Sequence, residues 1–363
     1  MRIGLIIYGT LDTVSGGYLY DRMLVEYLRR QGEQVEIISL PWRTYGRHLS
    51  HNFSRSLFQR LRQARLDVLL QDELNHPSLV WLNRRLRNRV RYPILSIVHH
   101  LRCSETRPAW QNGFYRWIEQ RYLTSVDGFI FNSQTTRAIV EGLVETNRMA
   151  VVAHPGGDRL HPNLTPDQIT VRARQSGPLR LLFVGNLISR KGLHTLLAGL
   201  ARLPRDSWQL DVVGSLDIDS TYVQFIRQQI ARQMAETGLT EQVTLSGSIS
   251  DADLATRLAQ SHLLAVPSSY EGFGIIYLEG MGFGLPAIAS TAGAASEIIT
   301  HGQDGFLVPP DDLATLAQHI HELSQNRERL LQMSLAARQR YALHPTWNES
   351  MEQVWQFLRS WVN

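Results

Sequence analysis

Short apolar segments of strand length alternate with helix-length segments along the whole chain, and this alternation limits the fold more than any other feature of the sequence. In the first half, strand-like segments occupy residues 2–9, 34–41, 66–73, 92–101, 127–133 and 149–157. Helix-length stretches separate several of them, among them 18–31 and the arginine-rich 78–90. This order predicts an α/β fold with a parallel sheet covered by helices on both faces. Such sheets bind ligands at the carboxyl ends of their strands.

The same order begins again after a polar, proline-containing stretch at 161–178, which we take as a domain boundary. Strands are predicted at 179–185, 208–214, 243–247, 263–268 and 286–290, with helices at 192–203, 220–237 and 251–260, one more before the last strand and two after it. A final helix, 346–361, places Trp347, Met351, Val354, Trp355 and Leu358 on one face and could cross back onto the first domain. The expected domains are 1–170 together with 346–363, and 178–345.

Composition favours a globular chain without a membrane span. Of the 363 residues, 43% are hydrophobic and 14 are proline, and no segment reaches the roughly 18 apolar residues of a spanning helix. The first residues lack the apolar region and cleavage site of a signal peptide. Cys103 is the single cysteine, so no internal disulfide can form. We therefore expect a cytoplasmic protein.

The net charge of +4 hides an uneven distribution. Residues 1–177 contain 24 Arg against 15 Asp and Glu, a charge of +9, and residues 178–363 contain 13 basic and 18 acidic residues, a charge of −5. Arginines gather at 54–66 and 81–91 among leucines at near-helical spacing. These segments are either solvated helix faces or an anionic-membrane surface with aromatic anchors; the candidate anchors are Trp42, Phe53, Phe58 and Trp81. A nucleic-acid partner is not expected, because no motif accompanies the basicity.

The segment "ISRKGLH" contains Lys191, the only lysine among 37 basic residues. It follows a predicted strand and begins a predicted helix, so Arg190 and Lys191 lie at a helix N-terminus. Cations there cost about 0.3–1 kcal/mol each when exposed. A bound phosphate would reverse the sign of this cost. The pair predicts a diphosphate site, although a bias toward arginine alone could leave one lysine in any loop.

Two carboxylates, Glu271 and Glu279, stand on either side of a Gly-Phe-Gly turn. Gly272 and Gly274 let backbone N–H groups approach an anion or a sugar hydroxyl closely. Glu279 falls inside a predicted helix, where a carboxylate needs hydrogen bonds, and a ribose diol would supply them. Glu271 could accept from sugar hydroxyls or stabilise positive charge on an anomeric carbon. Both could instead be surface residues, but together with the cations they predict a nucleotide-sugar site.

On these segments the sequence resembles the retaining GT-B glycosyltransferases of glycosyltransferase family 4. The motifs are "LLFVGNLISRKGLHTLL" and "PSSYEGFGIIYLEGMGFGLPAIAS", continued by "GAASEIITHGQDGFLVPPDD". In the first half, "SGGYLYDRML", "FNSQTT" and "HPGGD" are weaker matches. The resemblance covers essentially the whole chain.

The resemblance implies two Rossmann-like domains whose parallel sheets face each other across a cleft. It also implies a hexosyltransferase of the EC 2.4 class that retains anomeric configuration and needs no metal ion or other cofactor. The donor would be a UDP- or GDP-sugar, and the acceptor a glycan, glycolipid or lipid-linked saccharide of polysaccharide or glycolipid biosynthesis. The enzyme would work in the cytoplasm, with peripheral attachment to a membrane as one option.

By position, the resemblance also implies roles for residues of the second domain. Glu271 would contact the donor hexose as a catalytic group, and Glu279 the ribose. Arg190 and Lys191 would bind the diphosphate. The backbone of Gly272, Phe273 and Gly274 would contact the donor sugar and phosphates.

In the first domain, Gly16 and Gly17 would approach the donor phosphates, and His99 or His100 would be the catalytic histidine. Because side chains alternate along a strand, only one histidine should face the cleft. The choice between them stays open, with His100 preferred.

Two departures from the family pattern touch no proposed ligand. Gly280 and Gly282 stand where alanines are usual, which weakens that helix by roughly 1 kcal/mol each, and "HPGGD" replaces the commoner "NGVD". A catalytically silent sugar-nucleotide sensor or scaffold is the alternative function, but it could have lost Glu271 or the histidines, which are present. An epimerase or phosphorylase is a further alternative, and a phosphorylase would need a cofactor lysine besides Lys191.

Overall fold

The computed structural model describes residues 1–105, 107–145, 147–237 and 242–362, and it divides the chain into two compact units. The first comprises Met1–Pro155 and Pro345–Asn363, and the second Gly156–His344. Each has a hydrophobic core of its own. Asn363, the end of the predicted range 346–363, lies outside the described residues.

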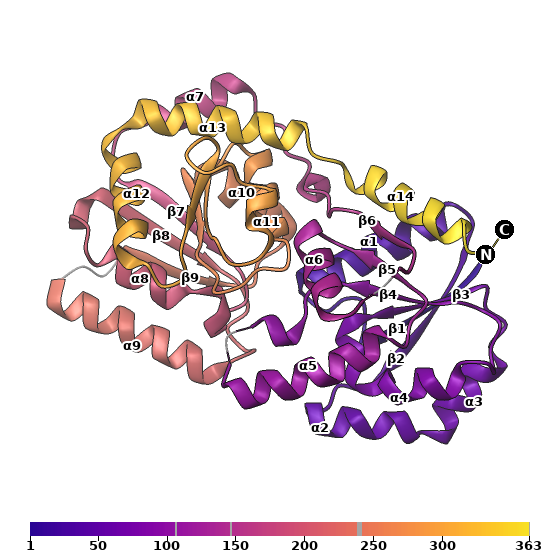
Figure 1. The fold of residues 1–363 in the computed structure, drawn as a ribbon. Helices are drawn as coiled ribbons and strands as arrows, with labels where there is room; N and C mark the ends of the chain where they lie inside the picture. Colours follow the sequence, from indigo (N-terminus) through magenta and orange to yellow (C-terminus); the bar gives the residue numbers. More distant parts are fainter. Residues whose placement is uncertain (106, 146, 238–241, 363) are drawn as a thin grey trace. The chain divides into compact units, whose positions relative to one another are not determined.

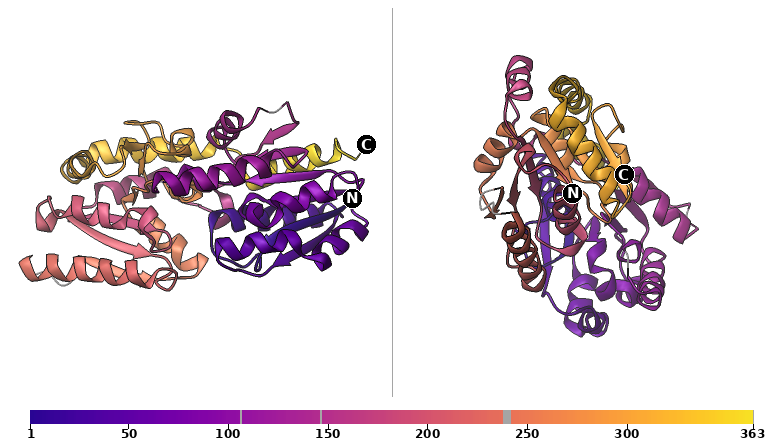
Figure 2. Two further views of the ribbon diagram at one scale, coloured as in Figure 1. Left: turned by 60° about the horizontal axis from the view of Figure 1, so that its bottom comes forward. Right: turned by 90° about the vertical axis from the view of Figure 1, so that its left-hand side faces the viewer.

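The first unit contains a six-stranded parallel sheet with helices on both faces (Figures 1 and 2). Its strands, in spatial order, are β2 (Gln34–Leu40), β1 (Arg2–Tyr8), β3 (Val68–Asp72), β4 (Ile94–Val98), β5 (Gly128–Phe131) and β6 (Ala150–Val152). Its helices are α1 (Gly16–Arg30), α2 (Tyr45–His48), α3 (Arg55–Gln63), α4 (His76–Leu86), α5 (Ala109–Leu123), α6 (Gln134–Leu143) and α14 (Trp347–Arg359). The order reverses between β1 and β3, which makes their carboxyl ends a switch point.

The second unit repeats this plan with a second six-stranded parallel sheet. Its strands, in spatial order, are β12 (Gly305–Val308), β11 (Ala287–Ser290), β10 (Leu263–Val266), β7 (Leu179–Val184), β8 (Trp208–Val213) and β9 (Val243–Gly247). Its helices are α7 (Pro166–Arg174), α8 (Leu193–Leu200), α9 (Ser220–Thr237), α10 (Asp251–Gln260), α11 (Ile275–Gly282), α12 (Leu313–Gln325) and α13 (Arg327–Ala342). The switch point lies between β7 and β10, which pair directly.

The boundary between the units differs from the sequence prediction. Residues 156–170 were expected in the first domain, but they belong to the second unit. The physical reason is packing, because the short helix at Asp158–Leu160 contacts α11 and helix α7 packs along α13. The stretch 161–178, predicted to be a boundary, therefore contributes a helix to the second unit.

The C-terminal helix α14 belongs to the first unit, where it packs against α1 (Figure 1). Its buried side chains include Trp347, Met351, Val354 and Leu358. Trp355, predicted on the same face, is only half-buried, and its indole N–H donates to Glu33 across 2.8 Å.

None of the helices within the described residues has the length and apolarity needed to cross a bilayer.

Candidate active site

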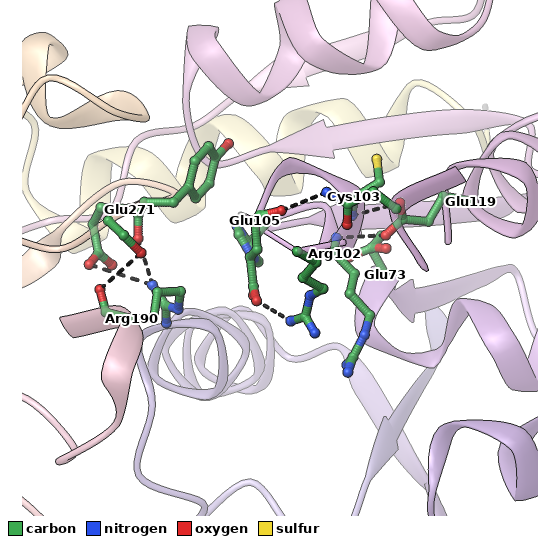
Figure 3. A network of polar contacts seen from close by, with 12 residues as sticks. Glu73, Arg102, Cys103, Glu105, Glu119, Arg190 and Glu271 are labelled. Carbon is green, nitrogen blue, oxygen red and sulfur yellow. Dashed lines mark hydrogen bonds and ion pairs between the residues drawn. The ribbon is translucent and has the colours of Figure 1, made fainter. Parts of the chain in front are cut away.

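Arg190, Lys191 and Glu271 meet at the switch point of the second unit. The chain leaving β7 forms a short turn at Ser189–Lys191, and the chain leaving β10 reaches Glu271 five residues after the strand ends. Lys191 Nζ donates to Glu271 Oε2 at 2.7 Å, and Arg190 Nη1 lies 3.8 Å from the same oxygen. Arg190 Nη1 also donates to the carbonyl of Tyr270 at 2.7 Å. Figure 3 shows Arg190 and Glu271 close together. The sequence predicted all three residues but not their direct contact.

The positive charges of Lys191 and Arg190 keep Glu271 ionised despite its burial. The exposed fractions of the Lys191 and Glu271 side chains are 16% and 14%. Burial raises the pKa of Glu271, but the positive charges of Lys191 and Arg190 outweigh it and bring the pKa to about 2. Burial lowers the pKa of Lys191, and the carboxylate opposes that shift. Two cations and one carboxylate leave this cluster with a net charge of +1.

Glycines let the two loops approach each other this closely. Gly192, directly after Lys191, has a φ of +74°, and a Cβ there would lie 2.1 Å from the carbonyl oxygen of Pro267. Gly293 has a φ of +95°, and its Cβ would lie 2.1 Å from the carbonyl oxygen of Glu271. A larger residue at Gly192 or Gly293 would displace the loop that contains Lys191 or the loop that contains Glu271.

The Gly-Phe-Gly turn directly precedes α11. Gly274 has a φ of +97°, and a Cβ there would lie 2.4 Å from the ring of Tyr277. The side chain of Phe273 is buried, so only its backbone is placed to meet a ligand. Contact of the backbone of Gly272, Phe273 and Gly274 with a donor sugar and its phosphates stays a prediction.

Glu279 has a partner that the sequence did not predict. It is buried inside α11, and its Oε1 accepts from Arg159 Nε at 2.9 Å. Burial raises the pKa of Glu279, and Arg159 opposes the shift. Arg159 also pairs with the exposed Asp251. The sequence offered one signal, because a carboxylate predicted inside an apolar helix requires a hydrogen-bonding or charged partner.

Close packing explains the two glycines that depart from the family pattern. A Cβ on Gly280 would lie 3.0 Å from Leu264, and one on Gly282 would lie 2.8 Å from Pro162 and 3.0 Å from Tyr341. The helix therefore approaches its neighbours at a distance that alanine would not allow without movement.

In the first unit, His99 directly follows β4, and its ring reaches residues of α1 and β3. His99 Nε2 is 3.1 Å from Asp21 Oδ1, and the ligand atoms of His99, Asp21 and Asp72 all lie within 4.8 Å of one another. A Cβ on Gly17 would lie 3.1 Å from the His99 ring, so this glycine approaches a histidine. Gly16 is exposed at the start of α1. Asp21 and Asp72 were missed by the sequence prediction.

Burial and the charge of Asp21 raise the pKa of Asp72 to about 8. Burial lowers the pKa of His99, but the hydrogen bond and charge of Asp21, with the charge of Asp72, raise it overall. These three residues have the ligand types of a divalent-cation site. The cluster can also form without an ion, because a proton on Asp72 removes the repulsion between its carboxylate and that of Asp21.

His100 has different surroundings. Its Nε2 lies 2.8 Å from Glu105 Oε1, and Glu105 also pairs with Arg107. Nearby, Glu119 accepts from the backbone N–H groups of Arg102 and Cys103 at 2.6 and 3.1 Å (Figure 3). The two histidines thus have separate carboxylate partners, and their catalytic assignment stays a prediction.

Comparison with solved structures identifies the fold. The chain superposes on sucrose-phosphate synthase from Thermosynechococcus elongatus with a TM-score of 0.81 and 22% identity, covering 99% of this chain and 98% of the other. It superposes on HepE from Anabaena, solved with UDP-glucose, with a TM-score of 0.79 and 19% identity, covering 99% and 100%. The fold is therefore that of the GT-B glycosyltransferases.

Sequence comparison then gives the family. The model of glycosyl transferases group 1 matches residues 166–340, and that of the glycosyl transferase 4-like domain matches 21–156. A phosphatidyl-myo-inositol mannosyltransferase from Mycobacterium leprae is 27% identical over 94% of this chain and 93% of its own length. The chain belongs to this glycosyltransferase family, GT4, and is a transferase enzyme.

Proposed function

We propose that this enzyme transfers a hexosyl group from a UDP- or GDP-sugar to a glycan, glycolipid or lipid-linked acceptor, with retention of anomeric configuration and without a metal ion. The observation that supports it most is the cluster of Arg190, Lys191 and Glu271 at a switch point. A nucleoside diphosphate bound at these strand ends would meet two cations. The net charge of the cluster favours an anion.

The side chains would supply the charge that the reaction needs. When the bond between the anomeric carbon and the diphosphate oxygen breaks, negative charge grows on the diphosphate and positive charge on the carbon. Arg190 and Lys191 would stabilise the diphosphate, and Glu271, ionised at neutral pH, the carbon. Retention requires the acceptor oxygen to bond on the face that the diphosphate leaves. The acceptor proton then departs with the diphosphate.

The remaining contacts complete the donor site. Oε1 of Glu279 is bound to Arg159, and we assign Oε2 to the ribose hydroxyls. The backbone of 272–274 would contact the sugar and phosphates. Gly16 and Gly17 would approach the phosphates from the first unit.

A lipid acceptor is supported by two observations. The relative from Mycobacterium leprae is named for phosphatidyl-myo-inositol, and residues 1–177 have a charge of +9. An acidic acceptor, or one held in an anionic membrane, suits this charge. Work at the membrane surface is therefore part of the proposal.

The test is release of nucleoside diphosphate from a panel of UDP-, GDP- and ADP-sugars, with and without lipid vesicles. Release from one donor that survives EDTA and is lost in Glu271→Ala is the expected result. Loss with EDTA that returns with added Mg²⁺ would contradict the metal-free assignment. Product NMR of the anomeric proton decides between retention and inversion.

A further inference from the structure

Helix α5 has an aromatic face exposed to water. Trp110, Phe114 and Trp117 have exposed fractions of 74%, 43% and 41%. Their spacing of four and three residues places them on one side of the helix, over about 10 Å of its length. The rings of Phe114 and Trp117 stack at 6.4 Å with 21° between their planes. The result is a continuous apolar strip rather than scattered exposed residues.

The opposite face of α5 is apolar too. Ile118, Tyr122 and Leu123 are buried in the core of the first unit, where α5 packs against α4 (Figure 1). A helix that is apolar on both faces is normally covered on both. The outer strip therefore indicates a contact surface.

The charges around the strip are positive. The guanidinium of Arg121 lies 3.8 Å from the centre of the Trp117 ring, and Arg116, in the same helix, is exposed. The only carboxylate in α5, Glu119, is buried and accepts from backbone N–H groups of the preceding turn. The outer face of the helix thus combines aromatic rings with arginines and presents no carboxylate.

We propose that α5 docks the first unit onto an anionic lipid surface. Trp and Phe would lie at the boundary between headgroups and acyl chains, and the arginines on anionic headgroups. A second copy of the chain fits less well, because a two-fold dimer would place the same positive strip against itself. The role of this surface rests on the proposed function, because membrane docking would bring the enzyme to a lipid-linked acceptor. Docking itself can be tested without any sugar donor.

This surface differs from the one that the sequence suggested. Phe58, a candidate anchor there, is buried in the core, with Arg85 4.7 Å above its ring. Trp42 is half-exposed, and its ring lies 5.1 Å from the ring of Tyr8 with 39° between their planes. Phe53 remains exposed, and it provides a matched control.

The experiment is co-sedimentation of the full chain with vesicles of phosphatidylcholine, with or without phosphatidylglycerol. We expect binding to the anionic vesicles that falls about tenfold or more in the triple variant Trp110→Ser, Phe114→Ser, Trp117→Ser. Arg121→Glu alone should weaken it about fivefold, and high salt should weaken it similarly. Phe53→Ser should have no effect.

Unchanged binding in the triple variant would overturn the proposal, as would an equal loss in Phe53→Ser. Absence of vesicle binding, with a dimer that the triple variant loses, would overturn it in favour of self-association. Circular dichroism and the Tm of each variant check folding. Diphosphate release without vesicles separates this outcome from a failure of the proposed function, because it measures donor turnover in the absence of a membrane.

A conservative variant supplies a spectroscopic readout. Trp110→Phe with Trp117→Phe should keep most of the binding, while quenching of tryptophan fluorescence by brominated lipid should fall sharply. Quenching that persists in this variant would mean that other tryptophans of the eight lie in the bilayer, which contradicts the assignment to α5.

Discussion

The side chain of Lys191 makes a close and specific contact with Glu271. The side chain runs along the surface of Gly185, where a Cβ would lie 3.4 Å from its carbons, and ends 2.7 Å from Glu271. Arginine differs here, because its planar guanidinium presents a rigid fork of donors instead of one compact ammonium.

We therefore predict that Lys191→Arg lowers kcat/KM about tenfold or more, as measured by diphosphate release. Arg174→Lys, in the exposed pair with Glu328, is the matched control and should keep full activity. Full activity in Lys191→Arg would mean that charge alone suffices at this position.

A substitution of Glu271 should distinguish binding of the nucleoside diphosphate from transfer of the sugar. Glu271→Gln removes a negative charge beside two cations, so affinity for a nucleoside diphosphate should stay the same or increase. Transfer should nevertheless fall about 100-fold or more, because the group that stabilises the anomeric carbon is lost. Calorimetry with UDP and GDP, together with kcat, measures both. Weaker diphosphate binding would contradict the charge argument. Glu322→Gln, in an exposed pair with Arg329, is the control.

The raised pKa of Asp72, about 8, makes stability depend on pH. The folded state holds a proton that the unfolded chain loses near pH 3.8, so this contribution is complete below that pH and is lost as pH rises toward 8. Asp72→Asn should therefore flatten the decline in the free energy of unfolding between pH 5 and 8. Urea denaturation at several pH values measures it. An unchanged decline would show that Asp72 is already ionised in the folded protein at these pH values.

At the scale of elements, the turns around the donor site depend on glycine. Gly302→Ala should cost about 1–2 kcal/mol, because its φ of +77° is unfavourable for a residue with a side chain. No collision adds to this cost, because no atom of the described residues lies within 4 Å of the new Cβ. Gly293→Ala should cost clearly more and also reduce activity, since its Cβ would collide with the Glu271 backbone. Thermal melts of the pair separate the two effects. Equal decreases in Tm would mean that the Glu271 loop moves to accommodate the new Cβ at little cost.

Regular elements could be predicted where the pattern was strong. The ranges 220–237, 243–247 and 251–260 agree with α9, β9 and α10. The strand β12 was missed because its apolar run, residues 306–308, is only three residues long and lies between a glycine turn and two prolines. Helix α5 was not singled out either, because apolar residues on both of its faces remove the 3.6-residue contrast.

Contacts between distant residues could not be predicted in the same way. Arg159 and Glu279 are 120 residues apart, and Asp21 and His99 are 78 apart. A single sequence records residue types along the chain, so it could predict that Glu279 needs a partner but not which residue provides it.

At the scale of the molecule, α14 ties the end of the chain to its beginning. Met351→Ala should cost about 2–5 kcal/mol, because this side chain is buried against the first unit. Hydrogen exchange should show lower protection in α1 and β6 but unchanged protection in residues 156–344. Leu343→Ala, at an exposed position just before the helix, is the control. Equal loss of protection in both units would mean that they unfold together.

The insertion of the second unit between Pro155 and Pro345 also sets the order of events on the ribosome. A ribosome that adds about 5–20 residues per second needs roughly 10–40 s to synthesise residues 156–344. During that interval α14 has not been synthesised, so the side of α1 that it covers remains exposed. The second unit, encoded later, has all of its residues first. The first unit is therefore synthesised first but completes its folding last. A chaperone that binds the nascent chain would find the α14-binding side of α1 still exposed.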